Sequence, residues 1–346
     1  MTVRNALTLG ELTTADRGRW DAFVDTCSEA TFFHRAGWQR IMEEVFGHRS
    51  WFLFAERNGN IEGVLPLAQI NSRLFGNNLM SLPFCVQGGV AAATDEAATL
   101  LVQAAREKAE ALGVDALEMR NRERRYPDWA HKDLYVTFRK ELDPDPEQNL
   151  KNIPRKQRAM VRKGIKAGLA SAWDEDVGRF YDAYSQSVRA LGTPVFSRRL
   201  FAVLRDEFGG DCRILTVTKG DKTIASVMSF YFRDEVLPYY GGGTAEARAL
   251  KANDFMYWEL MRHSTEEGIR IFDFGRSKQG AGSYNFKKNW GFLPEPLHYE
   301  YHLVKARDVP EVNPNNPKYQ FFIRLWRKMP LSMTHWLGPY IVRNLG

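Results

Sequence analysis

The chain has 346 residues, of which 44% are hydrophobic and 13% aromatic, so its composition excludes an intrinsically disordered protein. This length exceeds the size at which a single core usually stops growing, and we therefore expect two domains. The formal net charge of +6 comes from one segment, because residues 151–166 hold seven Lys and Arg and no acid; without them it is −1, which excludes a general coating of nucleic acid.

The first predicted elements form an α/β unit within residues 51–121. Alternating apolar and polar residues predict strands, and Asn58-Gly59-Asn60 predicts a hairpin turn between the first two. Gly88 and Gly89 follow the third strand. In chain order, the predicted elements are strands over 51–56, 61–70 and 79–86, a helix over 95–112 that ends at Gly113, and a strand over 114–119.

The basic segment comes next along the chain. Pro154 predicts the first turn of a helix, and Gly168 predicts its end. Arg158 and Arg162 of this helix are candidate contacts to an anionic substrate. With the basic run Arg120–Arg125, they could form a wall for a diphosphate-linked sugar or for tRNA. The segment lacks the aromatic residues on which RNA modules stack bases, and a solvated basic helix without a partner is the alternative.

Residues 213–277 repeat the pattern of the first unit. In chain order, they predict strands over 213–218, 223–232 and 236–240, a glycine run at Gly241, Gly242 and Gly243, a helix over 253–267 that ends at Gly268, and a strand over 269–274. The glycines of the two copies are offset by nearly the same number of residues, which indicates an internal duplication. We predict a first domain over 1–150, a helical linker over 151–168, a second domain over 169–310 and a tail over 311–346.

The second copy runs into the segment Asp273–Tyr299, which reads DFGRSKQGAGSYNFKKNWGFLPEPLHY. Glycines, hydroxyls, lysines and an arginine gather here at one strand end. This mixture suits an anionic, carbonyl-bearing ligand better than it suits a core. Arg276 and Ser277 are candidates to bind a phosphate or carboxylate, because the arginine fork holds such groups bidentately. An ion pair between Arg276 and Asp273 is the alternative.

The spacing Tyr284-x-Phe286-Lys287-x-x-Trp290-Gly291 resembles a motif of the Fem aminoacyltransferases, with Trp290 in place of the more usual Phe. The DFGRS lead-in and the PEPLHY exit resemble more closely the FemAB-related, GNAT-like proteins associated with exosortase and PEP-CTERM systems. The resemblance implies an α/β fold of tandem GNAT-like domains, each with a mixed, largely antiparallel sheet flanked by helices. It also implies an anionic acyl donor, either acyl-CoA or aminoacyl-tRNA, and an amine acceptor.

By this resemblance, Lys287 has the main catalytic role. It would polarise the donor carbonyl or stabilise the tetrahedral intermediate, whereas a surface lysine beside buried aromatic residues is the alternative. Asp273 either accepts the proton of the amine or caps the backbone that follows it. Ser283 and Tyr284, shortly before Lys287, are further candidates for substrate binding.

Tyr240 and Gly241–Gly243 mark the point where the third strand of the second copy is expected to give way to a loop. The backbone N–H groups of such a loop, together with the positive end of the following helix, can bind the diphosphate of an acyl carrier. GNAT enzymes that use acetyl-CoA usually have Arg/Gln-x-x-Gly-x-Gly/Ala here, whereas this chain has GGGTAEAR. This departure argues against acetyl-CoA as the donor without excluding it.

Several other function classes are excluded by their missing motifs. Asp273-Phe274-Gly275 matches the metal-binding triplet of kinases, but no His-Arg-Asp loop and no glycine-rich nucleotide loop accompany it. The lack of a Walker sequence, an HExxH motif or a His/Cys cluster predicts no metal and no tightly bound cofactor. Three scattered cysteines, no recognisable signal peptide and no apolar run near the roughly 20 residues of a membrane span predict a cytoplasmic protein.

The C-terminal segment 319–346 alternates aromatic and aliphatic residues with Arg and Lys. Phe321, Phe322, Leu325 and Trp326 form one apolar face of a predicted short helix before Pro330. A basic, aromatic-rich amphipathic tail can make peripheral contact with an anionic membrane. Packing of the tail on the domain behind it is the interpretation that we prefer.

Together these patterns predict direct transfer of an acyl or aminoacyl group to an amine of a cell-envelope or exopolysaccharide precursor. No covalent enzyme intermediate is expected, because no Ser-His-Asp or Cys-His arrangement is apparent. One alternative is an acetyl-CoA-dependent N-acetyltransferase of a small or sugar amine. The other is a non-catalytic module that docks at the membrane beside polymer-export machinery. The sequence leaves the donor, the acceptor and the oligomeric state open.

Overall fold

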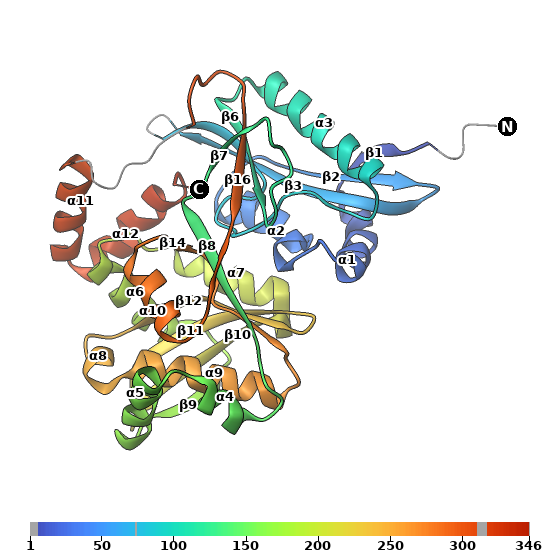
Figure 1. Cartoon of the computed structure of the whole chain (residues 1–346). Helices are drawn as coiled ribbons and strands as arrows, with labels where there is room; N and C mark the ends of the chain where they lie inside the picture. Colours follow the sequence, from blue (N-terminus) through green and yellow to red (C-terminus); the bar gives the residue numbers. More distant parts are fainter. Residues whose placement is uncertain (1–5, 73–74, 310–316, 346) are drawn as a thin grey trace. The chain divides into compact units, whose positions relative to one another are not determined.

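The structure is a computed structural model that describes residues 6–72, 75–309 and 317–345. Its elements group into two compact units (Figure 1). The first unit consists of the described parts of Met1–Tyr135, Pro296–Val312 and Asn344–Gly346, and the second consists of those of Val136–Glu295 and Asn313–Arg343. Each unit is an α/β structure in which helices flank one sheet.

The sheet of the first unit is largely antiparallel. Its strand order is β1 (Thr8–Glu11), β2 (Ser50–Arg57), β3 (Asn60–Ser72), β4 (Gly76–Met80), β6 (Ala116–Asn121), β16 (His298–Leu303) and β7 (Ala130–Lys132). The short β5 (Ala91–Ala92) pairs with β3. Only the neighbours β4 and β6 of this order run parallel.

Helix α3 (Asp95–Leu112) covers one face of this sheet. The helix begins at Thr94, whose hydroxyl accepts a hydrogen bond from Ala97 N at 3.2 Å, and it ends at Gly113, which has a φ of +57°. Its buried residues are Ala97, Leu101, Ala105 and Ala109. Because neighbouring residues of a strand point to opposite faces, Phe52 of β2 lies on the other side, where its ring contacts Trp20 of α1 (Arg17–Thr26).

The sheet of the second unit has the same kind of topology. Its strand order is β9 (Ala170–Asp174), β10 (Cys212–Lys219), β11 (Lys222–Phe232), β12 (Glu235–Gly243), β13 (Ile271–Asp273), β8 (Tyr135–Glu141) and β14 (Ser277–Lys278). The pair β12 and β13 is parallel, as β4 and β6 are in the first unit. The other pairs from β9 to β8 are antiparallel. The expected α/β fold of tandem units with flanking helices is therefore confirmed.

Helices cover both faces of the second sheet. Helix α9 (Ala252–Glu266) packs on one face, and α6 (Gly178–Leu191) and α7 (Arg198–Phe208) lie on the other (Figure 1). Helix α5 (Arg155–Lys166) packs in turn on α9. A Cβ atom at Gly164 of α5 would lie 2.7 Å from Phe255 Cβ of α9, so the glycine allows these two helices to approach closely.

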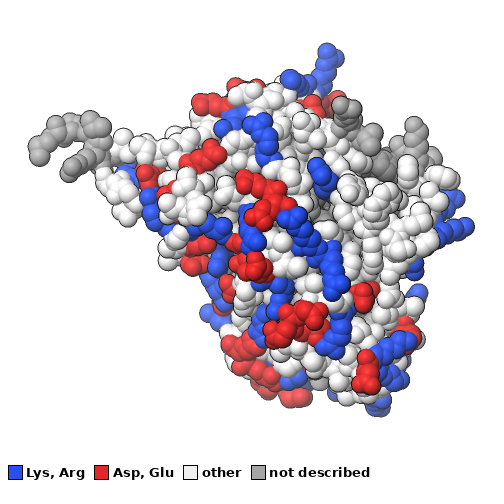
Figure 2. Space-filling model, turned by 180° about the vertical axis from the view of Figure 1, so that it is seen from behind, with Lys and Arg blue, Asp and Glu red and all other residues white. Residues whose placement is uncertain are grey.

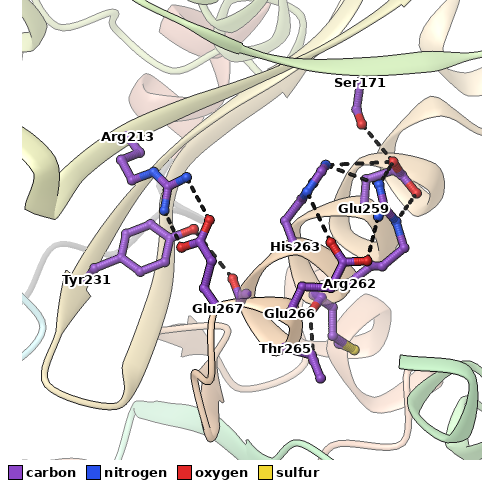
Figure 3. A network of polar contacts seen from close by, with 11 residues as sticks. Ser171, Arg213, Tyr231, Glu259, Arg262, His263, Thr265, Glu266 and Glu267 are labelled. Atoms are coloured by element: carbon purple, nitrogen blue, oxygen red, sulfur yellow. Dashed lines mark hydrogen bonds and ion pairs between the residues drawn. The ribbon is translucent and has the colours of Figure 1, made fainter. Parts of the chain in front are cut away.

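A network of charged side chains attaches α9 to the edge of the sheet that β9 and β10 form (Figure 3). The guanidinium of Arg213 donates two hydrogen bonds to Glu267, at 2.5 and 2.9 Å, and lies over the ring of Trp173. At the other end of the network, the Ser171 hydroxyl donates to Glu259 at 2.6 Å. These acids are already bound to partners, so we assign the network to the stability of the unit.

Each sheet includes one strand from a distant part of the chain. Strand β8, which falls within the predicted first domain, pairs with β13 of the second unit, and β16, within the predicted second domain, pairs with β6 of the first. The predicted linker 151–168 contains α5, which belongs to the second unit and contributes Val161 to its core. Local sequence patterns do not report which distant strands pair, so the predicted boundaries at 150 and 310 differ from those of the units.

The predicted third strand, 79–86, is shorter in the structure, since β4 ends at Met80. The following segment is buried and apolar like a strand, but Pro83 has no N–H to donate and Phe84 has a φ of +65°. The guanidinium of Arg120 takes the place of a pairing strand, because its Nη1 donates to the carbonyl oxygens of Leu82 at 3.2 Å and Cys85 at 2.7 Å.

Candidate active site

The candidate site begins at the end of β13, at the carboxylate of Asp273. This side chain is only 4% exposed. Its Oδ1 accepts hydrogen bonds from the Thr137 hydroxyl at 2.9 Å and from Gly275 N at 2.7 Å, and its Oδ2 lies 3.5 Å from Arg139 Nε. The bond to Gly275 is the backbone cap that we predicted as one of two roles. The role of Asp273 as a proton acceptor stays a prediction.

Helix α10 (Gly282–Asn289) brings Lys287 to the same turn. Tyr284, Lys287 and Trp290 are three residues apart, so they share a face of the helix, and this face packs on the core of the unit. The Lys287 side chain is 9% exposed, and its Nζ donates hydrogen bonds to the carbonyl oxygens of Gly275 at 2.8 Å and Arg276 at 3.0 Å. Lys287 is therefore not the surface lysine of the alternative interpretation.

Burial lowers the pKa of Lys287 from 10.5 to about 8, because the ammonium loses its hydration. The negative charge of Asp273 opposes this change, and the positive charge of Arg276 adds to it. The side chain can thus change its charge within a pH unit or so of neutrality. A burial-shifted pKa combined with specific charged neighbours is a property of functional sites.

This pKa predicts how folding stability depends on pH. The folded state loses the Lys287 proton near pH 8 and the unfolded chain near 10.5, so between these values the unfolded chain binds more protons. We expect the free energy of unfolding to rise with pH across this window, relative to that of Lys287→Met. Urea denaturation of both proteins at several pH values measures the difference, in which the other titrating groups cancel. A difference that is constant with pH would contradict the burial of the ammonium.

Ser277 and Arg276 lie directly after this turn. Ser277 begins β14, and its Oγ is buried and has no hydrogen-bond partner within the described residues. A buried hydroxyl without a partner costs free energy, so a ligand that pairs with it gains affinity. Arg276 is half-buried. The structure thus brings Asp273, Arg276, Ser277 and Lys287 together around one turn, and their contact with substrate stays a prediction.

The remaining candidates on α10 differ in exposure. Ser283 is exposed in the first turn of the helix. Tyr284 is half-buried, and its ring meets that of Phe138 edge-on, with 5.4 Å between the ring centroids. The ammonium of Lys288, which is exposed, lies 5.6 Å from the centroid of the Tyr284 ring. The Tyr284 side chain therefore packs from α10 against the sheet, and Ser283 faces solvent.

The prediction that Gly241–Gly243 form a loop is wrong, because these glycines are the last residues of β12 and pair with β11. A Cβ atom at Gly242 would lie 2.5 Å from Ser187 Cβ, so the glycine lets α6 pack directly on the strand. Tyr240 is 7% exposed and lies edge-on to the ring of Tyr184 in the aromatic core beneath α6. These residues therefore pack the unit, and their contact with a substrate stays a prediction.

A cavity of about 290 Å³ lies just beyond this strand. Its walls come from α6, from the start of β11 and from the turn Thr244–Glu246 before α8 (Ala247–Leu250). The Oγ1 atom of Thr244 is buried and has no hydrogen-bond partner in the part of the chain that the structure describes. The loop that follows β12 is therefore Thr244–Glu246, the three residues after the glycine run.

The basic helix α5 presents its charges to solvent. Its buried face consists of Gln157, Val161 and Gly164, while Arg162 is exposed and Arg158 donates a hydrogen bond to the carbonyl oxygen of Lys151 at 3.0 Å. On the face of the molecule in Figure 2, Lys and Arg are interspersed with Asp and Glu. Arg158 and Arg162 stay predictions as substrate contacts.

The first unit contains a polar cavity of about 180 Å³ at the end of β6. Its lining includes Asn121, Arg122 and Arg125 of the predicted basic wall, and also His34 and Glu29. Glu29 pairs with Arg125 at 2.5 Å, and burial lowers the pKa of His34 to about 4, so the imidazole is neutral at pH 7. Sequence reasoning missed His34 and Glu29, because no motif connects them to a strand end that follows them by more than 80 residues.

The known proteins that resemble this chain agree with this architecture. Residues 148–288 match the family model of the acetyltransferase (GNAT) domain, and they include α5, α9, β13 and Lys287. No curated protein matches the sequence. The similarity to a GNAT domain therefore lies within the second unit.

Three solved structures share the fold at low sequence identity. The crystal structure of FemX has a TM-score of 0.69 and 16% identity, and the match covers 91% of this chain and 100% of FemX. The tandem GNAT protein from the clavulanic acid biosynthesis pathway has a TM-score of 0.55 and 11% identity, with 88% and 100% covered. L-PGS from Bacillus licheniformis has a TM-score of 0.51 and 13% identity, with 84% and 95% covered.

Proposed function

We propose that this protein transfers an acyl or aminoacyl group from an activated carrier to an amine, and that the reacting carbonyl binds beside Lys287. One observation carries the proposal: a buried ammonium with a lowered pKa is anchored at the end of β13, within the region that matches the GNAT domain. An ammonium has three N–H groups. Backbone carbonyls accept from two groups of Lys287, so the third can donate to the carbonyl oxygen of the donor, where negative charge develops.

In this mechanism the acceptor amine attacks the carbonyl carbon directly, and the carrier leaves with the electrons of its ester or thioester bond. The proton that the amine loses ends on the oxygen or sulfur of the departing carrier. Asp273 is a positioning residue, because it holds the N–H of Gly275, whose carbonyl in turn holds Lys287. Ser277 and Arg276 supply a hydroxyl and a guanidinium beside this turn for the anionic carrier.

We further propose that the acceptor is a precursor of the cell envelope or of an exopolysaccharide. The motif resemblance to the FemAB-related proteins of PEP-CTERM systems supports this narrower statement. The polar cavity of the first unit also supports it, because Asn121, Arg122 and Arg125 suit a sugar that bears phosphate or carboxylate groups. The exposed cations of α5 suit a polyanionic donor such as aminoacyl-tRNA.

The cavity beside Thr244–Glu246 favours a second candidate function, an acetyl-CoA-dependent N-acetyltransferase. This turn follows a strand and precedes α8 and α9, which is the setting in which backbone N–H groups can bind a diphosphate. The unpaired hydroxyl of Thr244 offers a further donor.

Donor competition tests both candidates. Purified protein is incubated with radiolabelled aminoacyl-tRNA or with acetyl-CoA, each with an amino sugar, free or diphosphate-linked, and the products are identified by mass spectrometry. Transfer from aminoacyl-tRNA supports the first candidate, and transfer from acetyl-CoA alone supports the second. If no donor reacts and calorimetry detects binding of neither CoA nor tRNA, both are overturned in favour of a non-catalytic module.

A further inference from the structure

The C-terminal helices α11 (Pro317–Lys328) and α12 (Leu331–Val342) are held to the second unit by one side. On α11, Trp326 is buried, and Arg327 Nη2 donates a hydrogen bond to the carbonyl oxygen of Leu191 at 3.2 Å. On α12, a Cβ atom at Gly338 would lie 2.6 Å from the carbonyl oxygen of Val195. The packing that we preferred for the tail is therefore present for these two helices, while residues 310–316 lie outside the described residues.

The opposite side of this helix pair is apolar and open to solvent. Among the described residues, eleven large hydrophobic side chains are exposed, and six of them lie on α11 and α12. These six are Phe321 (60% exposed), Phe322 (65%), Leu325 (45%), Met333 (45%), Trp336 (68%) and Tyr340 (63%). Single exposed hydrophobic residues are common, but such a cluster on two consecutive helices marks an interaction surface. We call these six residues the apolar face.

The charge of the same segment is of one sign. Residues 317–345 contain five Lys and Arg and no Asp or Glu. Of these five, Arg324, Arg327, Lys328 and Arg343 are exposed. Cations next to exposed Trp, Tyr and Phe are the combination by which a helix lies in the interface of an anionic membrane, with the rings among the headgroups and the cations on lipid phosphates.

We infer that the apolar face of α11 and α12 docks this protein on the surface of an anionic phospholipid membrane. Each helix has 12 residues, fewer than the roughly 20 of a membrane span, so the pair lies in the interface. Within the described residues, no helix is long and apolar enough to cross a bilayer. A second copy of the chain is a poorer occupant, because a two-fold contact through this face would bring cations together with no acid between them.

This surface differs from the candidate active site, and the inference does not depend on the proposed function. None of the six residues of the apolar face is among the residues around the Asp273 turn. Changes to the apolar face are therefore expected to alter membrane binding and to leave soluble-substrate turnover unchanged.

Vesicle flotation of the full chain tests this inference. The probes are vesicles of phosphatidylcholine alone and of phosphatidylcholine mixed with phosphatidylglycerol. We expect the protein to float with the anionic vesicles only, and to be released by high salt. The double variant Phe322→Ser with Trp336→Ser should lower the partition coefficient about tenfold or more, because two large apolar side chains no longer insert.

The matched control is Leu293→Ser, which removes a side chain that is 77% exposed and lies outside α11 and α12. This control should float like the wild type, and near-identical circular dichroism should show that all variants are folded. The inference is overturned if the wild type does not bind anionic vesicles, or if it binds equally well after the double substitution. It is also overturned if the wild type is a dimer in solution that the double substitution converts to a monomer, since a second copy would then cover the face.

Discussion

Replacing Lys287 by Met is expected to lower kcat about a hundredfold or more while the protein stays folded. The methionine keeps most of the apolar stem of this buried side chain, but it cannot donate a hydrogen bond to the donor carbonyl. It also leaves the carbonyls of Gly275 and Arg276 without their shared donor. The loss should therefore appear in kcat for whichever carrier the competition experiment identifies.

The neighbouring lysine supplies the control for this substitution. Lys288 is exposed on the same helix, and Lys288→Met removes an equal charge from the same region. We expect it to keep kcat within about twofold, because an exposed cation contributes little to a buried site. A Lys287→Met enzyme with wild-type turnover would falsify the catalytic assignment. A Lys288→Met enzyme as slow as Lys287→Met would point to a general charge effect.

The rate should also fall as pH rises through about 8, where Lys287 loses its charge. An ammonium stabilises the developing oxyanion more strongly than a neutral amine does, because the interaction is charge-assisted. A general base at this position would give the opposite trend. The direction of the pH profile of kcat therefore separates the two roles for the same side chain.

Replacing Arg120 by Met is expected to destabilise the protein by about 3–5 kcal/mol, because it leaves a buried carboxylate without its partner. Arg120 is 3% exposed and Glu118 is 6% exposed, and the Arg120 Nε donates to Glu118 Oε1 at 2.6 Å. The same guanidinium holds the buried turn Leu82–Cys85 through two backbone carbonyls. Urea denaturation of the variant measures the loss.

Two further variants separate the causes of this loss. Arg122→Met, on the same basic run but exposed, should change the free energy of unfolding by less than about 0.5 kcal/mol. The double variant Arg120→Met with Glu118→Gln should recover part of the loss, because the unpaired charge is gone while the two carbonyls still lack a donor. Equal stability of Arg120→Met and the wild type would contradict the structural role of Arg120.

Local signals in the sequence determined much of the secondary structure. Helices α3 and α9 were predicted to within one residue at each end, because Gly113 and Gly268 adopt the positive φ that ends a helix. The repeated order of strands and helix was also predicted, since each copy carries its own alternation and turn residues. These features depend on neighbours within a few residues, which the sequence lists directly.

The candidate site was predicted as a set of named residues, without their burial or their contacts. The motif pointed to Lys287, but not to its burial, which follows from the helical spacing of Tyr284, Lys287 and Trp290 and from the core on which that face packs. The position of Gly241–Gly243 within a strand was missed because a glycine run has the same sequence whether it forms a loop or lies beneath a helix. Only the close approach of α6 to the strand distinguishes the two.

By itself, then, the sequence determined the helices with their ends, the repeated unit, the basic segment and the lysine motif. The tertiary structure decided that β8 and β16 each join the sheet of the other part of the chain, and that Arg120 is buried and lines a cavity together with Asn121 and Arg122. The physical reason is the separation along the sequence over which each kind of interaction acts. Hydrogen-bonded caps and side-chain periodicity act over a few residues, whereas the pairing of β8 and of β16 joins residues more than a hundred positions apart.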